Sequence, residues 1–392
     1  MKLLERNYLT KIIHVIGTPD IKVITGIRRS GKSCLLLQFM EYINQTDKDA
    51  NIIFVDFNSL SAEPYLEYHA LNNYIEGQYK SNKNNYVCID EVQMCSGFEK
   101  AINSLHSSMK YDIYITDSNA FLLSSDLATL FTGRTYEIEV FPFSYKECLK
   151  YYDGQYSLDR YVREGGMPGT LLYREKDDKY KYIRDVFETL IIKDITNKYS
   201  IRNKEVIHDL AYFMIDNISS LTSAYNISKS LANANIKITD KTIKLYMQYL
   251  KDSYLFYKVR RYDIKGKKCL ATNDKYYLSD HSFRYAIIGT KNMDYGRVYE
   301  NIVAIELLRR GYEVYVGKLY KKEVDFVAIK QNEKIYFQVS DDISNQKTFD
   351  REVTSLLEIQ DAYPKILLAN THHDEYQYEG VKIIDIEEWL KL

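Results

Sequence analysis

The sequence predicts an α/β protein with a parallel sheet in its N-terminal third and a second α/β unit at its C-terminal end. Two observations predict the first sheet: short apolar runs recur along the chain, and stretches with helical character separate them. Apolar strands that alternate with helices are typical of a parallel sheet covered on both faces. The strands expected in this sheet span 21–25, 51–57, 86–89, 112–116 and 136–140.

The predicted secondary structure changes twice in the rest of the chain, from a helical region to helices with a hairpin and then to the C-terminal α/β unit. Residues 144–215 have helical periodicity around one break, the Gly-Gly-Met-Pro-Gly run at 165–169. Two further helices, near 225–233 and 240–253, precede a hairpin whose turn we expect at 265–267. The C-terminal unit begins with a helix at 298–309, followed by strands expected at 312–316, 323–329, 334–339, 365–369 and 381–385.

Composition excludes several classes of protein. The 392 residues carry a formal net charge of −1, so no overall field directs the chain to nucleic acid or to a membrane. No apolar run approaches 18 residues, and charges interrupt the N-terminus, so we expect a cytoplasmic protein without a membrane segment. The five scattered cysteines form no C-x-x-C pair, so they suggest neither a zinc site nor a disulfide framework and fit a reducing cytosol.

The most informative motif is the eight-residue run at 26–33, which fits the phosphate-binding pattern G-x-x-x-x-G-K-S. It lies between a β-rich run and an apolar helical run, as the pattern requires. Its glycines let backbone N–H groups surround a phosphate, and the following helix points its positive end at the same anion. We expect Lys32 to reach the β- and γ-phosphates and Ser33 to bind Mg²⁺. The predicted ATP-binding residues are Gly26, Ile27, Arg28, Arg29, Ser30, Gly31, Lys32, Ser33 and Cys34.

A second nucleotide motif lies 57 residues after Ser33, where the expected strand 86–89 ends in Asp90 and Glu91. Two acids after an apolar strand form a Walker B signature. Asp90 is expected to hold Mg²⁺, directly or through water, and Glu91 to polarise the attacking water.

Other polar residues near the expected sheet are candidates for contact with the nucleotide. Ser118 or Asn119, after the strand at 112–116, is placed to touch the γ-phosphate or the water. Arg134 precedes the last strand and acts either as an arginine finger, on its own or a neighbour's nucleotide, or only as a solvated surface residue. Arg28 and Arg29 add positive charge to the loop or pair with acids elsewhere.

Residues 221–270 form a basic region. They hold eleven Lys and Arg against three Asp, a local net charge of +8. Ile243, Met247 and Leu250 form one apolar stripe on the expected helix, with basic residues opposite. A basic helix face followed by a basic hairpin matches a winged helix on duplex DNA, and a winged helix that only packs internally is the alternative. The candidate DNA-binding residues are Lys241, Lys244, Gln248, Lys251, Arg260, Arg261, Lys265, Lys267 and Lys268.

The C-terminal unit has the outline of a PD-(D/E)XK nuclease. Glu300 lies on a helix, Asp325 on one strand and Gln338 on the next. Such enzymes need acids to bind Mg²⁺ and a lysine to orient water. Here Gln338 stands at the position of an acid and Ser340 at that of the lysine. We therefore expect a vestigial site that is structural or holds DNA, with a catalytic nuclease as the alternative.

Taken in order, these motifs resemble the AAA-type ATPases that carry a C-terminal domain of the DUF4143 kind. The resemblance covers nearly the whole chain. It rests on residues 26–33, 89–93, 122–128 with 132–134, 141–144, 165–168 and 323–326 with 338–339.

This resemblance implies a P-loop AAA-like parallel sheet with a helical lid, then a winged helix and a C-terminal restriction-endonuclease-like domain. It implies ATP and Mg²⁺ as cofactors. Asp117 departs from the family, which usually has glycine there, and its carboxylate is expected to repel the γ-phosphate. The predicted domains are 1–145 (ATPase core), 146–215 (lid), 216–285 (winged helix) and 286–392 (C-terminal domain).

Three functional hypotheses follow. The first is a Mg²⁺-dependent ATPase whose nucleotide state controls the basic winged-helix module, on double-stranded DNA. The second is an ATP-dependent conformational switch that recruits a protein partner, or forms a homo-oligomer, without DNA. The third is an ATP-gated, Mg²⁺-dependent nuclease.

Overall fold

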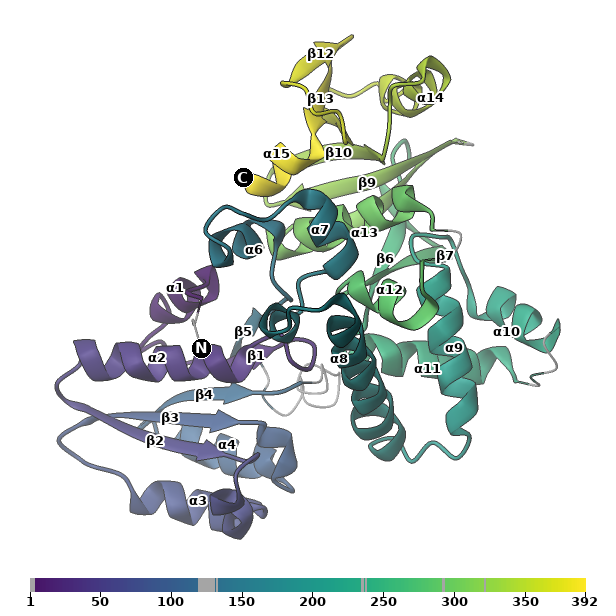
Figure 1. Cartoon of the computed structure of the whole chain (residues 1–392). Helices are drawn as coiled ribbons and strands as arrows, with labels where there is room; N and C mark the ends of the chain where they lie inside the picture. Colours follow the sequence, from purple (N-terminus) through teal and green to yellow (C-terminus); the bar gives the residue numbers. More distant parts are fainter. Residues whose placement is uncertain are drawn as a thin grey trace. The chain divides into compact units, whose positions relative to one another are not determined.

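The predicted parallel sheet is confirmed in a computed structural model of the chain. Its five strands have the order β2-β3-β4-β1-β5, and all the pairs between neighbours are parallel (Figure 1). The described residues are 4–118, 131, 133–233, 236, 238–290, 293–320 and 322–392. Their strands in this sheet are β1 (Ile21–Thr25), β2 (Ala50–Asp56), β3 (Asn84–Asp90), β4 (Asp112–Thr116) and β5 (Thr135–Glu139).

Helices cover both faces of this sheet. On one face, Phe39 of α2 packs on Tyr114 of β4 with ring centroids 4.2 Å apart. On the other face, Val87 and Ile89 of β3 share an apolar core with α3 and α4. Alternating strand residues therefore face different helices, as a buried parallel sheet requires. The described helices of this part are α1 (Asn7–Ile13), α2 (Lys32–Thr46), η1 (Leu60–Tyr65), α3 (Tyr68–Gly77), η2 (Val92–Met94) and α4 (Phe98–Ser107).

The chain divides into two compact units. The first contains Met1–Pro142 and Asp252–Tyr254, and the second contains Phe143–Lys251 and Leu255–Leu392. The boundary at 142 lies three residues before the predicted end of the ATPase core. The predicted lid, winged helix and C-terminal domain all fall within the second unit, apart from Asp252–Tyr254.

Helices form the first part of the second unit, and the glycine run at 165–169 is a packing feature within it. Phe143 N donates to Gly166 O at 2.6 Å, and Gly166 N donates to Asp280 Oδ2 at 2.7 Å. A Cβ at Gly166 would lie 1.9 Å from Phe143 O, so only glycine fits there. The described helices are α6 (Tyr145–Tyr151), α7 (Leu158–Glu164), η4 (Pro168–Leu172), α8 (Lys176–Thr189), η5 (Leu190–Asn197), α9 (Lys204–Asp216), α10 (Ala224–Asn233), α11 (Asp240–Asp252) and α12 (Ser282–Ile288).

A mixed sheet of eight strands, ordered β12-β13-β11-β10-β9-β8-β6-β7, forms the rest of the second unit (Figure 1). Val353 and Leu356 of α14 pack on Val327 and Tyr336 in one core. The strands are β6 (Phe256–Asp263), β7 (Lys268–Leu278), β8 (Glu313–Leu319), β9 (Lys322–Lys330), β10 (Glu333–Ser340), β11 (Lys365–Ala369), β12 (Tyr376–Tyr378) and β13 (Val381–Asp385). The helices are α13 (Tyr295–Arg309), α14 (Gln346–Leu357) and α15 (Ile386–Lys391).

The predicted boundary at 285/286 is wrong, because this sheet crosses it. β6 and β7 form the expected hairpin, but β6 also pairs in parallel with β8, from Arg260 opposite Tyr315 to Asp263 opposite Lys318. The hairpin is thus the edge of the C-terminal sheet and not a free wing. The order of helices and hairpin still fits a winged helix, which stays a prediction.

Among the described residues, no helix combines the length and the apolar character that a bilayer span requires.

Candidate nucleotide site

The phosphate-binding loop connects β1 to α2 through three residues with positive φ. Gly26 has φ 127°, Arg29 has φ 69°, and Gly31, which precedes α2, has φ 102°. A Cβ on Gly26 would lie 2.2 Å from Val140 O, so the loop rests directly on the backbone that follows β5. The predicted strand, loop and helix are therefore present in the required order.

Lys32 folds back over this loop. Its buried Nζ donates to Gly26 O at 2.9 Å and to Ile27 O at 3.1 Å. Burial lowers the pKa of the Lys32 ammonium, while the charges of Glu91 and Asp117 oppose this shift. The cation thus binds the loop and feels the charges of the acids where β3 and β4 end.

The two predicted Mg²⁺ ligands lie side by side. Ser33, in the first turn of α2, hydrogen-bonds to the Asp90 carboxylate at the end of β3. Only 3% of Asp90 is exposed, and burial raises the pKa of its carboxyl, although the hydrogen bonds from Thr116 and Ser33 lower it. A hydroxyl beside a buried carboxylate is a donor set that suits Mg²⁺.

Thr116 holds the two Walker B acids together, a role that the sequence reasoning missed. Because β4 lies between β1 and β3, the end of β4 adjoins both nucleotide motifs. Thr116 Oγ1 donates to Asp90 Oδ1 at 2.6 Å and accepts from Glu91 N at 2.9 Å. The sequence does carry one signal for Thr116: it is a hydroxyl residue at the end of the strand that neighbours the Walker B strand.

Glu91 is oriented from two sides. Its backbone is left-handed, with φ 55°, and Ser118 Oγ donates to its Oε1 at 2.7 Å. Gln93 Nε2 donates to the other oxygen, Oε2. Ser118 thus contacts the acid that is predicted to activate water, and Gln93 is a further site residue that the sequence reasoning did not assign.

Asp117 is fully buried, and its N–H donates to Ile24 O at 3.0 Å. Its charge raises the pKa of Lys32, so the carboxylate lies near the ammonium. The expected repulsion of the γ-phosphate stays a prediction.

Arg134 lies at the other end of the sheet from the phosphate loop. Its carbonyl accepts from Ile21 N at 2.8 Å, at the start of β1, whereas the loop follows the end of β1. Five residues of strand separate the two ends, about 16 Å. An action of Arg134 on its own nucleotide does not fit this placement. An action on a neighbour's nucleotide stays a prediction, and the predicted Asn119 lies outside the described residues.

The site suits Mg²⁺ and ATP. Ser30 Oγ is buried within the loop and has no hydrogen-bond partner among the described residues, as expected for a group that awaits a ligand. Lys32 supplies a cation, and Ser33 and Asp90 supply hard oxygen ligands. Of the remaining loop residues, Arg29 is exposed, and Arg28 and Cys34 are half-buried.

The predicted basic residues fall into two separate groups. On α11 the apolar stripe is buried as predicted, and Lys241, Lys244, Gln248 and Lys251 are exposed at helical spacing on the other side. The second group lies on the hairpin, with Lys265, Lys267 and Lys268 at its turn. Since β6 begins just after α11, about 26 Å of strand separates the turn from the helix. Arg260 and Arg261 lie in the part of β6 that pairs with β8.

The nuclease-like residues form a buried ionic cluster. Lys275 Nζ of β7 lies 2.9 Å from Glu300 Oε1 and 2.7 Å from Glu323 Oε1. Burial alone would lower the pKa of Lys275, but Glu300, Asp325 and Glu323 outweigh it and raise that pKa. Burial also raises the pKa values of Glu300 and Asp325. Sequence reasoning missed Lys275, which belongs to a strand outside the nuclease pattern.

Gln338 is bound within the same region. Its Nε2 donates to Glu352 Oε2 at 2.7 Å, and its Oε1 accepts from Asp325 N at 3.2 Å. The described residues contain no group of three or more His, Cys, Asp or Glu side chains that could hold a metal ion. The vestigial site and the catalytic nuclease both stay predictions.

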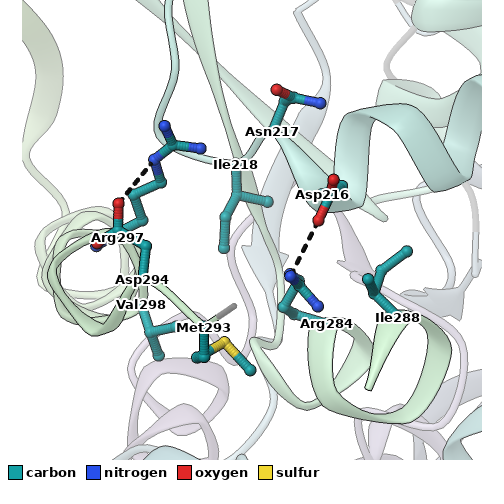
Figure 2. A pocket seen from close by; sticks show the side chains of 9 residues that line it. All are labelled: Asp216, Asn217, Ile218, Arg284, Ile288, Met293, Asp294, Arg297 and Val298. Carbon is teal, nitrogen blue, oxygen red and sulfur yellow. Dashed lines mark hydrogen bonds and ion pairs between the residues drawn. The ribbon is translucent and has the colours of Figure 1, made fainter. Parts of the chain in front are cut away.

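Figure 2 shows a pocket of about 390 Å³ in the second unit. Arg284 Nη2 lies 2.9 Å from Asp216 Oδ1, and Arg297 Nε lies 3.2 Å from Asp294 Oδ2 (Figure 2). Each of these arginines therefore faces a carboxylate of the pocket itself. No residue that the sequence predicts as functional lines this pocket.

Comparisons with known proteins match two families. Residues 18–149 match an AAA domain, and residues 155–294 match a domain of unknown function, DUF8612. DUF8612 stands where the sequence resemblance suggested a lid and a winged helix, and the DUF4143 resemblance of the C-terminal part stays a prediction.

The similar proteins include an uncharacterized protein of Haemophilus influenzae, 37% identical over 98% of both chains. The uncharacterized protein MJ1544 of Methanocaldococcus jannaschii is 27% identical over 100% of this chain and 90% of its own. Among solved structures, AMPPCP-bound DnaA from Aquifex aeolicus is 15% identical, with a TM-score of 0.32 over 62% of this chain and 86% of its own. A likeness of this size says nothing about function.

Proposed function

Because this chain belongs to the same family as the Haemophilus influenzae protein and carries an AAA domain, we propose that it is a Mg²⁺-dependent ATPase. An AAA domain implies nucleotide binding. The observation that carries the proposal is the chain of contacts from Ser33 through Asp90 and Thr116 to Glu91. It supports the proposal because the residues proposed to hold Mg²⁺ and the proposed general base lie together where β3 and β4 end.

Each residue has a distinct role in this proposal. Bound Mg²⁺ would neutralise phosphate charge and orient the transferred phosphoryl group. Ser33 and Asp90 would hold the metal ion, and Lys32 would leave its loop carbonyls to bind phosphate oxygens. Glu91 would accept the hydrogen bond of the attacking water, while Ser118 fixes its carboxylate.

Nucleotide binding is tested by calorimetry with Mg²⁺ and a non-hydrolysed ATP analogue. Lys32→Ala removes the buried cation of the loop, so we expect binding to weaken at least about tenfold. Lys48→Ala is the matched control, since Lys48 is an exposed lysine of the same unit. If Lys32→Ala and the native protein bind the ATP analogue with equal affinity, the assignment of residues 26–33 as the ATP site is wrong.

We further propose that the nucleotide state controls how the second unit engages double-stranded DNA in the cytoplasm. The exposed face of Lys241, Lys244, Gln248 and Lys251 on α11 supports DNA as the partner. The incorporation of the hairpin into the sheet limits the DNA surface to α11 and the hairpin turn.

The DNA proposal is tested by titrating duplex DNA at several salt concentrations. Phosphate contacts make affinity fall steeply with salt, and Lys241→Glu/Lys244→Glu should weaken binding and flatten that slope. Lys48→Glu/Lys347→Glu changes the net charge equally at exposed positions elsewhere and should have little effect. A salt-independent affinity, or equal losses in both variants, would favour the alternative switch that recruits a protein partner.

A further inference from the structure

Arg6 is buried next to the phosphate loop. It directly precedes α1, and 6% of it is exposed. Removing a guanidinium from water is costly unless hydrogen bonds replace the lost hydration. Arg6 Nη1 donates to Ser30 O at 3.0 Å, and Nη2 donates to Phe141 O at 2.8 Å and to Pro142 O at 3.3 Å.

The three carbonyls belong to two segments that are far apart in the sequence. Ser30 lies within the phosphate loop, 24 residues from Arg6. Phe141 and Pro142 follow β5, and Pro142 is the last residue of the N-terminal segment of the first unit. The planar fork of an arginine bonds several acceptors at fixed angles, which a lysine cannot do. Arg6 therefore sets the position of the loop backbone relative to residues 141–142.

Other contacts fix the same two segments. Val140 N donates to Thr25 O at 2.9 Å, immediately before the loop. Phe141 N donates to the Tyr8 hydroxyl at 3.3 Å, and the Arg6 guanidinium lies 4.7 Å from the centre of the Tyr8 ring. With Gly26 packed on Val140, the segment 140–142 has little freedom to move independently of the loop.

The residue that follows Pro142 is hydrogen-bonded within the second unit. Phe143 begins the second unit, where its N–H donates to Gly166 O at 2.6 Å. Its carbonyl accepts from the Tyr161 hydroxyl at 3.0 Å. Arg6 thus binds the last two residues before the boundary within the first unit, and Gly166 and Tyr161 bind the first residue after it within the second unit.

We propose that Arg6 is a positioning residue that couples nucleotide binding to the second unit. This inference rests on the proposed ATP site. When phosphates bind, the loop backbone near Ser30 adjusts, and Arg6 passes the adjustment to residues 141–142 and so to Phe143. Linkage makes the coupling reciprocal, so a partner bound by the second unit changes nucleotide affinity through the same contacts.

The experiment measures amide hydrogen exchange of the full chain with and without a saturating, non-hydrolysed ATP analogue and Mg²⁺. In the native protein, bound nucleotide should change exchange within residues 143–166. In Arg6→Ala, nucleotide affinity should fall about tenfold, and at saturation the change within 143–166 should disappear. Arg6→Lys keeps the charge but not the fork, so it should fold and still lose most of the change.

Tyr8→Phe serves as the control. It removes the hydroxyl that accepts from Phe141 N but leaves the three bonds of Arg6, so the native response should persist. A response in Arg6→Lys equal to that of the native protein, or an equal loss in Tyr8→Phe, would overturn the inference. Native protein that binds nucleotide without any change in 143–166 would also overturn it. Native protein that binds no nucleotide would instead remove the proposed function.

Discussion

Thr116 Oγ1 lies 2.6 Å from Asp90 Oδ1 and donates a hydrogen bond to it at the centre of the candidate site. The same oxygen accepts from Glu91 N at 2.9 Å. One hydroxyl thus holds the proposed Mg²⁺ ligand Asp90 and the candidate base Glu91 in a fixed relation, although it need not touch the nucleotide.

Thr116→Val tests this relation, because valine keeps the shape of threonine and removes its hydroxyl. A lost hydrogen bond to a buried carboxylate costs about 1.5–3 kcal/mol. We expect ATP turnover to fall roughly 10- to 100-fold, with a higher Mg²⁺ requirement, measured by phosphate release at varied Mg²⁺. Thr116→Ser should recover most of the rate. Native turnover in Thr116→Val would show that the hydroxyl does not organise the acids.

The raised pKa of the Asp90 carboxyl predicts how the stability of the protein depends on pH. Burial raises the pKa of its carboxyl, so between the ordinary and the raised pKa the folded chain binds more protons than the unfolded chain. This group therefore makes stability fall as pH rises through that window. Asp90→Asn should raise the melting temperature at pH 7 without Mg²⁺, by roughly 3 °C, and should lose this advantage near pH 4. If Asp90→Asn raises the melting temperature equally at both pH values, the effect does not come from the ionised carboxylate of Asp90.

Arg134→Ala tests whether the arginine acts between chains. Since Arg134 lies at the opposite end of the sheet from the phosphate loop, we expect nucleotide affinity to be unchanged. Any loss of turnover should appear only at protein concentrations where chains associate. The measurement is turnover per chain across a dilution series, with light scattering for oligomer size. A loss that is equal at all dilutions would point to an indirect structural role instead.

Lys275→Met tests the buried cluster of the second unit. The substitution leaves Glu300 and Glu323 without their counter-charge, which typically costs about 3–5 kcal/mol when a buried ion pair is broken. Urea unfolding should show this loss, and Lys275→Met/Glu300→Gln should recover part of it. Lys267→Met, at the exposed hairpin turn, is the control. A neutral effect of Lys275→Met would mean that the cluster contributes little to stability.

The loop and the Walker B pair were predictable because their chemistry depends on local order: strand, glycine turn, helix, then strand and acids. Thr116 and Lys275 were not, since their roles depend on which strands become neighbours. The same reason explains the error at 285/286. The hairpin pattern is local, whereas the pairing of Arg260 with Tyr315 joins distant parts of the chain and leaves no periodic signal.

The most direct test of the central claim is ATP hydrolysis by Glu91→Gln beside the native protein, with nucleotide binding measured on the same samples. We expect turnover to collapse at least about 100-fold while Mg²⁺-dependent binding is retained, because the amide no longer accepts the proton of the attacking water. Glu76→Gln, an exposed acid of the same unit, should keep native turnover. Unchanged turnover in Glu91→Gln would contradict the account.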